Sequence, residues 1–203
     1  MSHGHDEALV TGTFDISSPG DQARVLRLAE SLVAGGGTSH DMSIDLALAH
    51  KLALSRRDVV ELDWTGRIVI AFAMWGEQRR LRPRDADNPT GEDSLHTKLE
   101  QLDWLFADTG IKWTLVPVDD GDPGDSASIA AERADLHPLG DHVTVLRLGD
   151  VVPAETGALA TLGHVDDSRK GGAIVYGALH ALEHHADAIV ITDADNSVHL
   201  GQI

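Results

Sequence analysis

The sequence predicts an α/β protein built on a three-layer, mostly parallel sheet, with a small helical extension at its N-terminus. From Arg67 onward, short apolar runs typical of buried strands alternate with longer segments of helical periodicity. Before Arg67 the pattern is helical only. We therefore expect a flexible tail and helical extension over residues 1–66 and one sheet-containing domain over residues 67–203.

The N-terminal third carries one polar segment and two amphipathic ones. Residues 1–20 are rich in Gly, Ser and His and predict a mobile tail. Residues 18–37 predict a helix with a Pro-Gly-Asp start and a triple-glycine end, and its apolar stripe is Val25, Leu28, Ala29 and Leu32. Residues 39–58 predict a second helix, with the stripe Ile44, Leu48 and Leu52.

The remainder of the chain alternates between strands and helices. The apolar runs predict strands at 67–75, 111–118, 142–148 and 187–192. The segments of helical period predict helices at 94–110, 126–136 and 169–186. Because each strand is followed by a helix or a long connection, the strands are expected to run parallel.

Composition restricts the classes of partner. The 203 residues include 33 Asp and Glu against 16 Lys and Arg, a formal charge of −17, which disfavours nucleic acid and anionic membranes as partners. A phosphate-bearing ligand would then need a metal, a basic side chain or a helix N-terminus beside it. The absence of cysteine excludes disulfides and thiol catalysis. We expect no membrane span and, without a secretory signal, a cytoplasmic protein.

Charged residues cluster directly after the predicted strands. The acidic ones are Glu77, the pair Asp119 and Asp120, and the pair Asp193 and Asp195; Arg169 and Lys170 begin the last helix. In parallel sheets the carboxyl ends of the strands share one edge, where ligands bind. An Asp-x-Asp pair offers the hard oxygen ligands that suit Mg²⁺ or Mn²⁺, and Lys170 with the free amides of a helix start could take phosphate charge. The alternative is that each acidic pair is only turn chemistry.

Four of these segments, in order, resemble the nucleotide-sugar glycosyltransferases of the GT-A fold, of the family-2 type. Ala73–Glu77 resembles the end of that family's first strand, and residues 118–134 (VDDGDPGDSASIAAERA) resemble its Val-Asp-Asp-Gly-Ser segment. The start of the helix at 169–181 is similar to its Gly-Lys-Gly-Ala-Ala segment, and residues 191–197 (ITDADNS) are similar to its Asp-x-Asp motif.

The resemblance implies a Rossmann-like nucleotide-binding half, a hexosyltransferase activity and a nucleotide-sugar donor. It implies the donor-binding residues Glu77, one or both of Asp119 and Asp120, Arg169, Lys170 and Asp193. Glu77 and one of the two aspartates would face the base and ribose, and Lys170 or Arg169 the base or phosphates. Asp193 would approach the ribose or the metal, and Asp195 would ligate Mg²⁺ or Mn²⁺, which offsets charge on the departing diphosphate.

The sequence also departs from that family. Gly76 stands in place of an asparagine and Arg169 in place of a glycine. In the family a second half follows the Asp-x-Asp motif and carries the acceptor site, whereas this sequence ends at Ile203, so we expect a chain truncated after the motif, with no identifiable general base and an unknown acceptor. A half-built domain would expose apolar surface and could form a homo-oligomer.

Three interpretations of function follow. The first is a metal-dependent glycosyltransferase or its donor-binding part. The second is a nucleotide-sugar-binding module, or an inactive remnant, without transferase activity. The third is another Mg²⁺-dependent α/β protein, such as a phosphotransfer enzyme, although the first strand is not followed directly by the aspartate expected there. Two features stay open. Trp75 is expected either to line the donor pocket or to lie in the core or at its edge, as the other tryptophans are. The arginine-rich loop between Gly76 and Glu92 is expected to be solvated, to cover the donor or to contact an anionic acceptor.

Overall fold

The structure is a computed structural model that describes residues 14–35 and 43–203. The first 13 residues of the expected tail, and two of the three glycines at 35–37, lie outside this range. Four strands form one sheet in the order β3-β2-β1-β4, and every neighbouring pair is parallel. The strands are β1 (Arg67–Met74), β2 (Lys112–Asp119), β3 (Leu146–Arg147) and β4 (Ala188–Thr192). The α-helices are α1 (Pro19–Gly35), α2 (Ile44–Glu61), α3 (Ser94–Phe106), α4 (Ser126–Asp135) and α5 (Gly171–Glu183).

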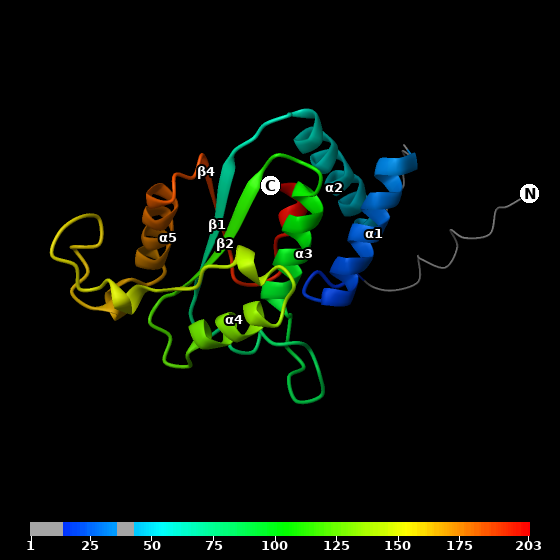
Figure 1. Cartoon of the computed structure of the whole chain (residues 1–203). Helices are drawn as coiled ribbons and strands as arrows, with labels where there is room; N and C mark the ends of the chain where they lie inside the picture. The colour runs from blue at the N-terminus through cyan, green and yellow to red at the C-terminus, as the bar shows by residue number, and fades with distance from the viewer. Residues whose placement is uncertain (1–13, 36–42) are drawn as a thin grey trace, which may run out of the picture.

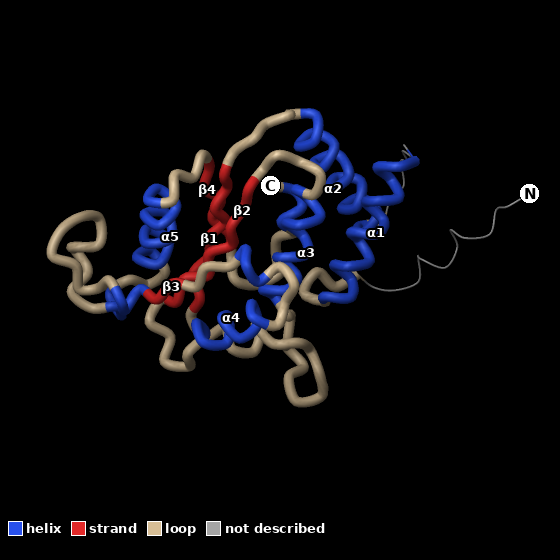
Figure 2. Tube along the Cα trace, viewed as in Figure 1, coloured by secondary structure: helices blue, strands red, loops and turns tan. Residues whose placement is uncertain are grey.

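Helices cover both faces of the sheet, as the sequence predicts (Figures 1 and 2). Side chains alternate along β1: Ile70 and Phe72 join the core beneath α3 and α4, whereas Val69 and Ala71 join the core beneath α5. The second core is thin, and α5 approaches the sheet closely. A Cβ added to Gly177 would lie 2.9 Å from the Cβ of Ala71, so glycine permits this approach.

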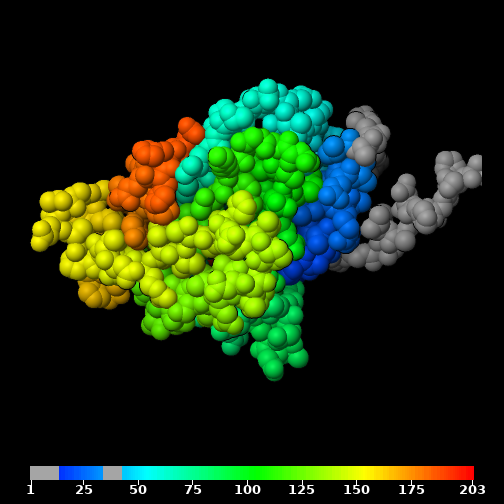
Figure 3. Space-filling model, viewed as in Figure 1, coloured from blue at the N-terminus to red at the C-terminus, as the bar shows by residue number. Residues whose placement is uncertain are grey.

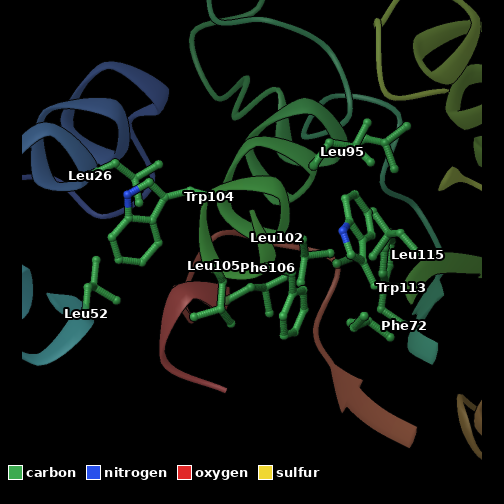
Figure 4. Packing of buried hydrophobic residues seen from close by; sticks show 14 of the residues in the cluster. Leu26, Leu52, Phe72, Leu95, Leu102, Trp104, Leu105, Phe106, Trp113 and Leu115 are labelled. Atoms are coloured by element: carbon green, nitrogen blue, oxygen red, sulfur yellow. The ribbon is translucent and has the colours of Figure 1, made fainter. Parts of the chain in front are cut away.

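The N-terminal helices pack against α3 and share its core. Leu26 of α1 and Leu52 of α2 belong to the same hydrophobic cluster as Leu102, Trp104 and Leu105 of α3 (Figure 4). The helical extension therefore contributes to the main core. Its helices form a further layer, outside the three layers made by the sheet and the helices on its two faces (Figure 1).

The third strand is the element that differs most from expectation. Its apolar run predicts a strand over 142–148, but only Leu146 and Arg147 pair with β2, preceded by an isolated bridge between Leu115 and Val143. β3 lies at the sheet edge, and a short 3-10 helix, Leu148–Asp150, turns the chain away directly after it. The loop that follows projects from the body of the molecule (Figure 3). In the described part of the chain, no helix is both long enough and apolar enough to cross a bilayer.

After the carboxyl end of β4 the chain turns back toward α2 and α3. It ends in a short 3-10 helix, Leu200–Gln202, packed between α2 and α3. Leu200 is fully buried, and its N–H donates to Oε1 of Gln101 on α3 at 2.8 Å. The chain from His199 onward is therefore held in the main core, whereas Ser197 and Val198 are exposed.

His199 lies in this returning segment, fully buried and neutral. Its Nδ1 accepts a hydrogen bond from the N–H of Gly201 at 3.0 Å, so a proton on that atom would break the bond. Burial, together with the positive charge of Lys98, lowers the pKa of His199 to about 4. In the unfolded chain His199 is protonated below its ordinary pKa of 6.5, whereas in the folded chain it is protonated only below about pH 4.

We therefore expect His199→Asn to reduce the acid sensitivity of the fold. Asparagine keeps an acceptor for the Gly201 N–H and cannot be protonated. Between pH 7 and pH 5 the free energy of unfolding of the wild type should fall by about 2 kcal/mol more than that of the variant. Urea unfolding at several pH values measures both slopes, and parallel slopes would contradict a buried neutral His199.

Candidate functional site

The carboxyl ends of β1, β2 and β4 enclose a cleft of about 230 Å³, called here the carboxylate cleft. Its lining includes Trp75, Glu77, Asp120, Lys170, Asp193 and Asp195. Five of these residues are candidates named from the sequence. They meet because each follows a strand, or begins the helix that precedes β4, and parallel strands end at the same edge.

The two aspartates of the Asp-x-Asp pair differ in their contacts. Asp193 is half-exposed, and its Oδ1 accepts a hydrogen bond from Nζ of the equally exposed Lys170. Such an exposed ion pair stabilises the fold little and can exchange partners readily. Lys170 thus places a positive charge beside Asp193, a location where a divalent cation or a phosphate could compete for either partner.

Asp195 is oriented by its own turn. Its Oδ1 accepts hydrogen bonds from the N–H of Ser197 at 3.1 Å and from the Ser197 hydroxyl at 2.6 Å. Burial alone would raise the pKa of Asp195, but these hydrogen bonds and the charges of Lys98 and Arg80 hold it below its ordinary value. The carboxylate is therefore ionised at neutral pH, as a metal ligand must be.

A fully buried lysine lies beneath the cleft. Nζ of Lys98, on α3, donates to the backbone carbonyl of Asp195 and lies 5.7 Å from the centroid of the Phe72 ring. Burial lowers its pKa to about 8, although the nearby carboxylates, led by Asp195 and Glu92, oppose the shift. Sequence analysis missed Lys98. The available signal was its place on the apolar stripe of the predicted helix, between Leu95 and Leu102.

The two consecutive aspartates at the carboxyl end of β2 have separate tasks. Asp119 accepts hydrogen bonds from the N–H groups of Gly121 at 2.7 Å and Asp122 at 2.8 Å, so it caps its own turn and does not line the cleft. Asp120 accepts hydrogen bonds from the Ser168 hydroxyl and from the backbone N–H of Lys170. Of the two candidates, Asp120 is therefore the one at the site, where it fixes the start of α5.

A second hollow of about 460 Å³ adjoins the cleft and is called here the tryptophan hollow. Trp75 and Lys170 line both spaces, whereas Arg169 and Val165 line only this one. Trp75 is 64% exposed and offers an aromatic face to a planar ligand. Arg169 and Lys170 have φ angles of 45° and 79°, which are uncommon for residues with a side chain and which Asp120 helps to hold.

Ion pairs with Arg80 hold the side of the cleft that Glu77 lines. Arg80 donates from Nη1 to Oε2 of Glu77 at 2.8 Å and contacts Oε1 of Glu92 from Nε at 3.2 Å. These carboxylates raise the pKa of Arg80, chiefly through the hydrogen bond to Glu77. Oε2 of Glu92 also accepts from the N–H of Asn196 at 2.8 Å, which ties this wall to the Asp-x-Asp loop. Sequence analysis did not single out Glu92.

The donor set fits a magnesium or manganese ion that shares its coordination with a ligand. Among the described residues no three His, Cys, Asp or Glu side chains converge on one point as a complete cation cage. Mg²⁺ usually takes only one or two carboxylates from the protein, and substrate phosphates and water supply the rest. Asp193 and Asp195 in one cleft meet that requirement.

No protein-family model, curated protein or solved structure matches the chain. The parallel α/β sheet is established by the structure itself. The resemblance to GT-A glycosyltransferases stays a hypothesis from the sequence motifs, and the assignment of the site must rest on its geometry and chemistry.

Proposed function

We propose that the protein binds a nucleoside-diphosphate sugar with Mg²⁺ or Mn²⁺ and is a glycosyltransferase, or the donor-binding part of one. The observation that carries this proposal is that two neighbouring spaces meet at the carboxyl edge of the sheet. There the carboxylate cleft, with Asp193, Asp195 and Lys170, opens beside the tryptophan hollow, with Trp75 and Arg169. One space suits a metal and a diphosphate, and the other suits a planar base.

Each residue has a task in this proposal. The base lies against Trp75 in the tryptophan hollow, and Arg169 approaches the base or the phosphates. Lys170 leaves Asp193 to contact the diphosphate, and Asp193 and Asp195 then hold the cation. When bound, the cation would supply Lewis-acid stabilisation of the departing diphosphate.

Two further residues act through others. Lys98 holds the backbone carbonyl of Asp195 and so fixes the Asp-x-Asp loop. Asp120 holds the N–H of Lys170 and so fixes the start of α5. Both are positioning residues, because they contact the protein, whereas the residues they hold contact the proposed ligand.

The second candidate is a nucleotide-sugar-binding module without transferase activity. Within the described residues each carboxylate of the cleft already accepts a hydrogen bond: Glu77 from Arg80, Asp120 from Ser168 and Lys170, Asp193 from Lys170, and Asp195 from Ser197. A general base needs a carboxylate or imidazole free to take a proton from the acceptor. With two of these carboxylates assigned to the cation, the other two tied to the protein and no histidine among the described residues that line the cleft, binding without catalysis is favoured.

A donor-cleavage assay separates these candidates. The protein is incubated with UDP-, GDP- and dTDP-hexoses in Mn²⁺, and both bound donor and released nucleoside diphosphate are measured. A transferase is expected to release nucleoside diphosphate slowly even to water, whereas a binding module returns the bound donor intact. Donor that is neither bound nor cleaved would contradict both candidates.

A further inference from the structure

The N-terminal helical extension places one buried polar side chain against the Asp-x-Asp loop. Gln22, near the start of α1, is only 1% exposed. Its Nε2 donates to the backbone carbonyl of Ile16 at 2.6 Å and to the backbone carbonyl of Asn196 at 3.3 Å. Because Asn196 directly follows Asp195, this contact joins α1 to the loop that carries the proposed metal ligands.

The contacts of the Gln22 amide determine its orientation. Both hydrogens of Nε2 have a carbonyl acceptor, and Oε1 accepts a hydrogen bond from Nε2 of Gln101 at 3.1 Å. If the amide were turned over, its oxygen would face the carbonyl oxygens of Ile16 and Asn196, which cannot donate. Loss of Gln22 would therefore remove a hydrogen-bond partner from buried groups on α3 and on the loop.

Gln101 of α3 extends this contact to the far end of the same loop. Gln101 is 1% exposed, and its Oε1 accepts from the N–H of Leu200 at 2.8 Å. A buried series of hydrogen bonds thus runs from Leu200 through Gln101 and Gln22 to Asn196. The two glutamines, one on α1 and one on α3, hold both ends of the segment 196–200.

The exposed part of that segment orients the carboxylate of Asp195. Ser197 is exposed, and its N–H and hydroxyl donate the two hydrogen bonds to Oδ1 of Asp195. Since Ser197 has no burial of its own to fix it, its position depends on how the ends of the segment are held.

The extension also contacts the loop between β1 and α3. Nη1 of Arg84, in that loop, lies 3.1 Å from Oδ2 of Asp15, and its Nη2 donates to the Ser17 hydroxyl at 2.9 Å. Glu92 of the same loop accepts from Asn196 twice, through Oε2 at 2.8 Å and through its backbone carbonyl at 3.0 Å. The extension and the two loops are therefore joined by hydrogen bonds at this end of the sheet.

We propose that Gln22 is a positioning residue for the Asp-x-Asp loop, so that the N-terminal extension is part of the metal site. This inference rests on the proposed function and adds an element outside the sheet-containing domain to those that the site requires. Gln22 leaves the ligand untouched. It fixes Asn196 directly and Leu200 through Gln101, and so keeps Asp195 oriented before the cation arrives.

The test compares Gln22→Met with the control Asp45→Ala in the full chain. Methionine occupies a similar volume but cannot donate to Asn196 and accepts only weakly from Gln101. Asp45 is a buried residue of α2 whose Oδ2 accepts from Nη1 of Arg24 on α1 at 2.7 Å. The control therefore weakens the same extension while the hydrogen bonds to the loop remain.

The first readout is amide hydrogen exchange in the absence of any ligand. The N–H groups of Asn196 and Leu200 donate to Glu92 and Gln101, so they exchange only when the loop opens. In Gln22→Met both should exchange about tenfold faster relative to the amides of β1, and in Asp45→Ala the ratio should stay at its wild-type value. The same ratio in wild type and Gln22→Met would overturn the link between α1 and the loop.

The second readout is the affinity for nucleoside diphosphate in Mn²⁺, measured by calorimetric titration. We expect it to fall about tenfold in Gln22→Met and to be unchanged in Asp45→Ala. Gln22→Asn is a milder second variant. It keeps the amide but is a methylene too short to reach Ile16, Asn196 and Gln101 together, so it should move both readouts in the same direction.

The two readouts separate this inference from the proposed function. If the loop amides of Gln22→Met exchange faster but its nucleotide affinity equals that of the wild type, the metal site does not need Gln22 and the inference is wrong. If the wild type itself binds no nucleotide with metal, the proposed function falls and the positioning role falls with it. In that case the exchange data still show whether Gln22 holds the loop.

Discussion

Asp195→Asn is expected to lower the affinity for nucleoside diphosphate in Mn²⁺ by at least about 100-fold. The substitution removes the negative charge of the metal ligand and leaves the shape of the side chain unchanged. The remaining carbonyl oxygen can still accept both hydrogen bonds from Ser197, so the turn after β4 should persist. Calorimetric titration measures the affinity, and the thermal unfolding midpoint checks that the fold is intact.

Asp108→Asn is the matched control for this change. The Asp108 side chain is 95% exposed, and its only described ion pair, with Arg56 at 3.7 Å, lies on the surface. Its φ angle of 60° is one that asparagine also adopts readily. Both variants lose one negative charge, but only Asp195→Asn should lose nucleotide. Wild-type affinity in Asp195→Asn would place the metal elsewhere.

Asp120→Ala is expected to weaken both the fold and the site. It leaves the Ser168 hydroxyl and the N–H of Lys170 without their acceptor, at a turn where Arg169 and Lys170 have positive φ angles. We expect the free energy of unfolding to fall by about 2–3 kcal/mol, as is usual for buried donors left unpaired. Nucleotide affinity should fall at least about tenfold, because the start of α5 carries Lys170. Urea unfolding and calorimetric titration measure the two effects.

The neighbouring variant Asp119→Ala supplies the comparison. Asp119 is equally buried and also accepts two hydrogen bonds, but both come from backbone N–H groups of its own turn. It should therefore lose stability and keep most of its nucleotide affinity. If Asp119→Ala loses nucleotide and Asp120→Ala retains it, the structure assigns the two aspartates to the wrong tasks.

Much of the fold could be predicted from local patterns. β1 and β2 are continuous apolar runs because both of their faces are covered, and glycines or acidic turns mark the ends of the helices. The length of β3 could not be predicted. Its residues favour a strand, but pairing at a sheet edge depends on where the chain must turn next.

The site was predictable to the extent that sequence position determines spatial position. Residues that follow parallel strands converge at one edge, which places Glu77, Asp120 and Asp193 together. The choice between Asp119 and Asp120 was not predictable, because it depends on Ser168, 48 residues away from Asp120. The support from Lys98 likewise depends on tertiary packing, which brings α3 beneath a loop 97 residues later in the chain.

The most direct test of the central claim, a metal-dependent nucleotide site at the sheet edge, is calorimetric titration of the wild type with UDP, GDP and dTDP. Each titration is done once in Mn²⁺ and once in EDTA. We predict that one of the three nucleotides binds in Mn²⁺ and loses most of its affinity in EDTA, since Asp193 and Asp195 repel a diphosphate unless a cation lies between them. Equal affinity in Mn²⁺ and EDTA, or no binding of any nucleotide, would contradict the account.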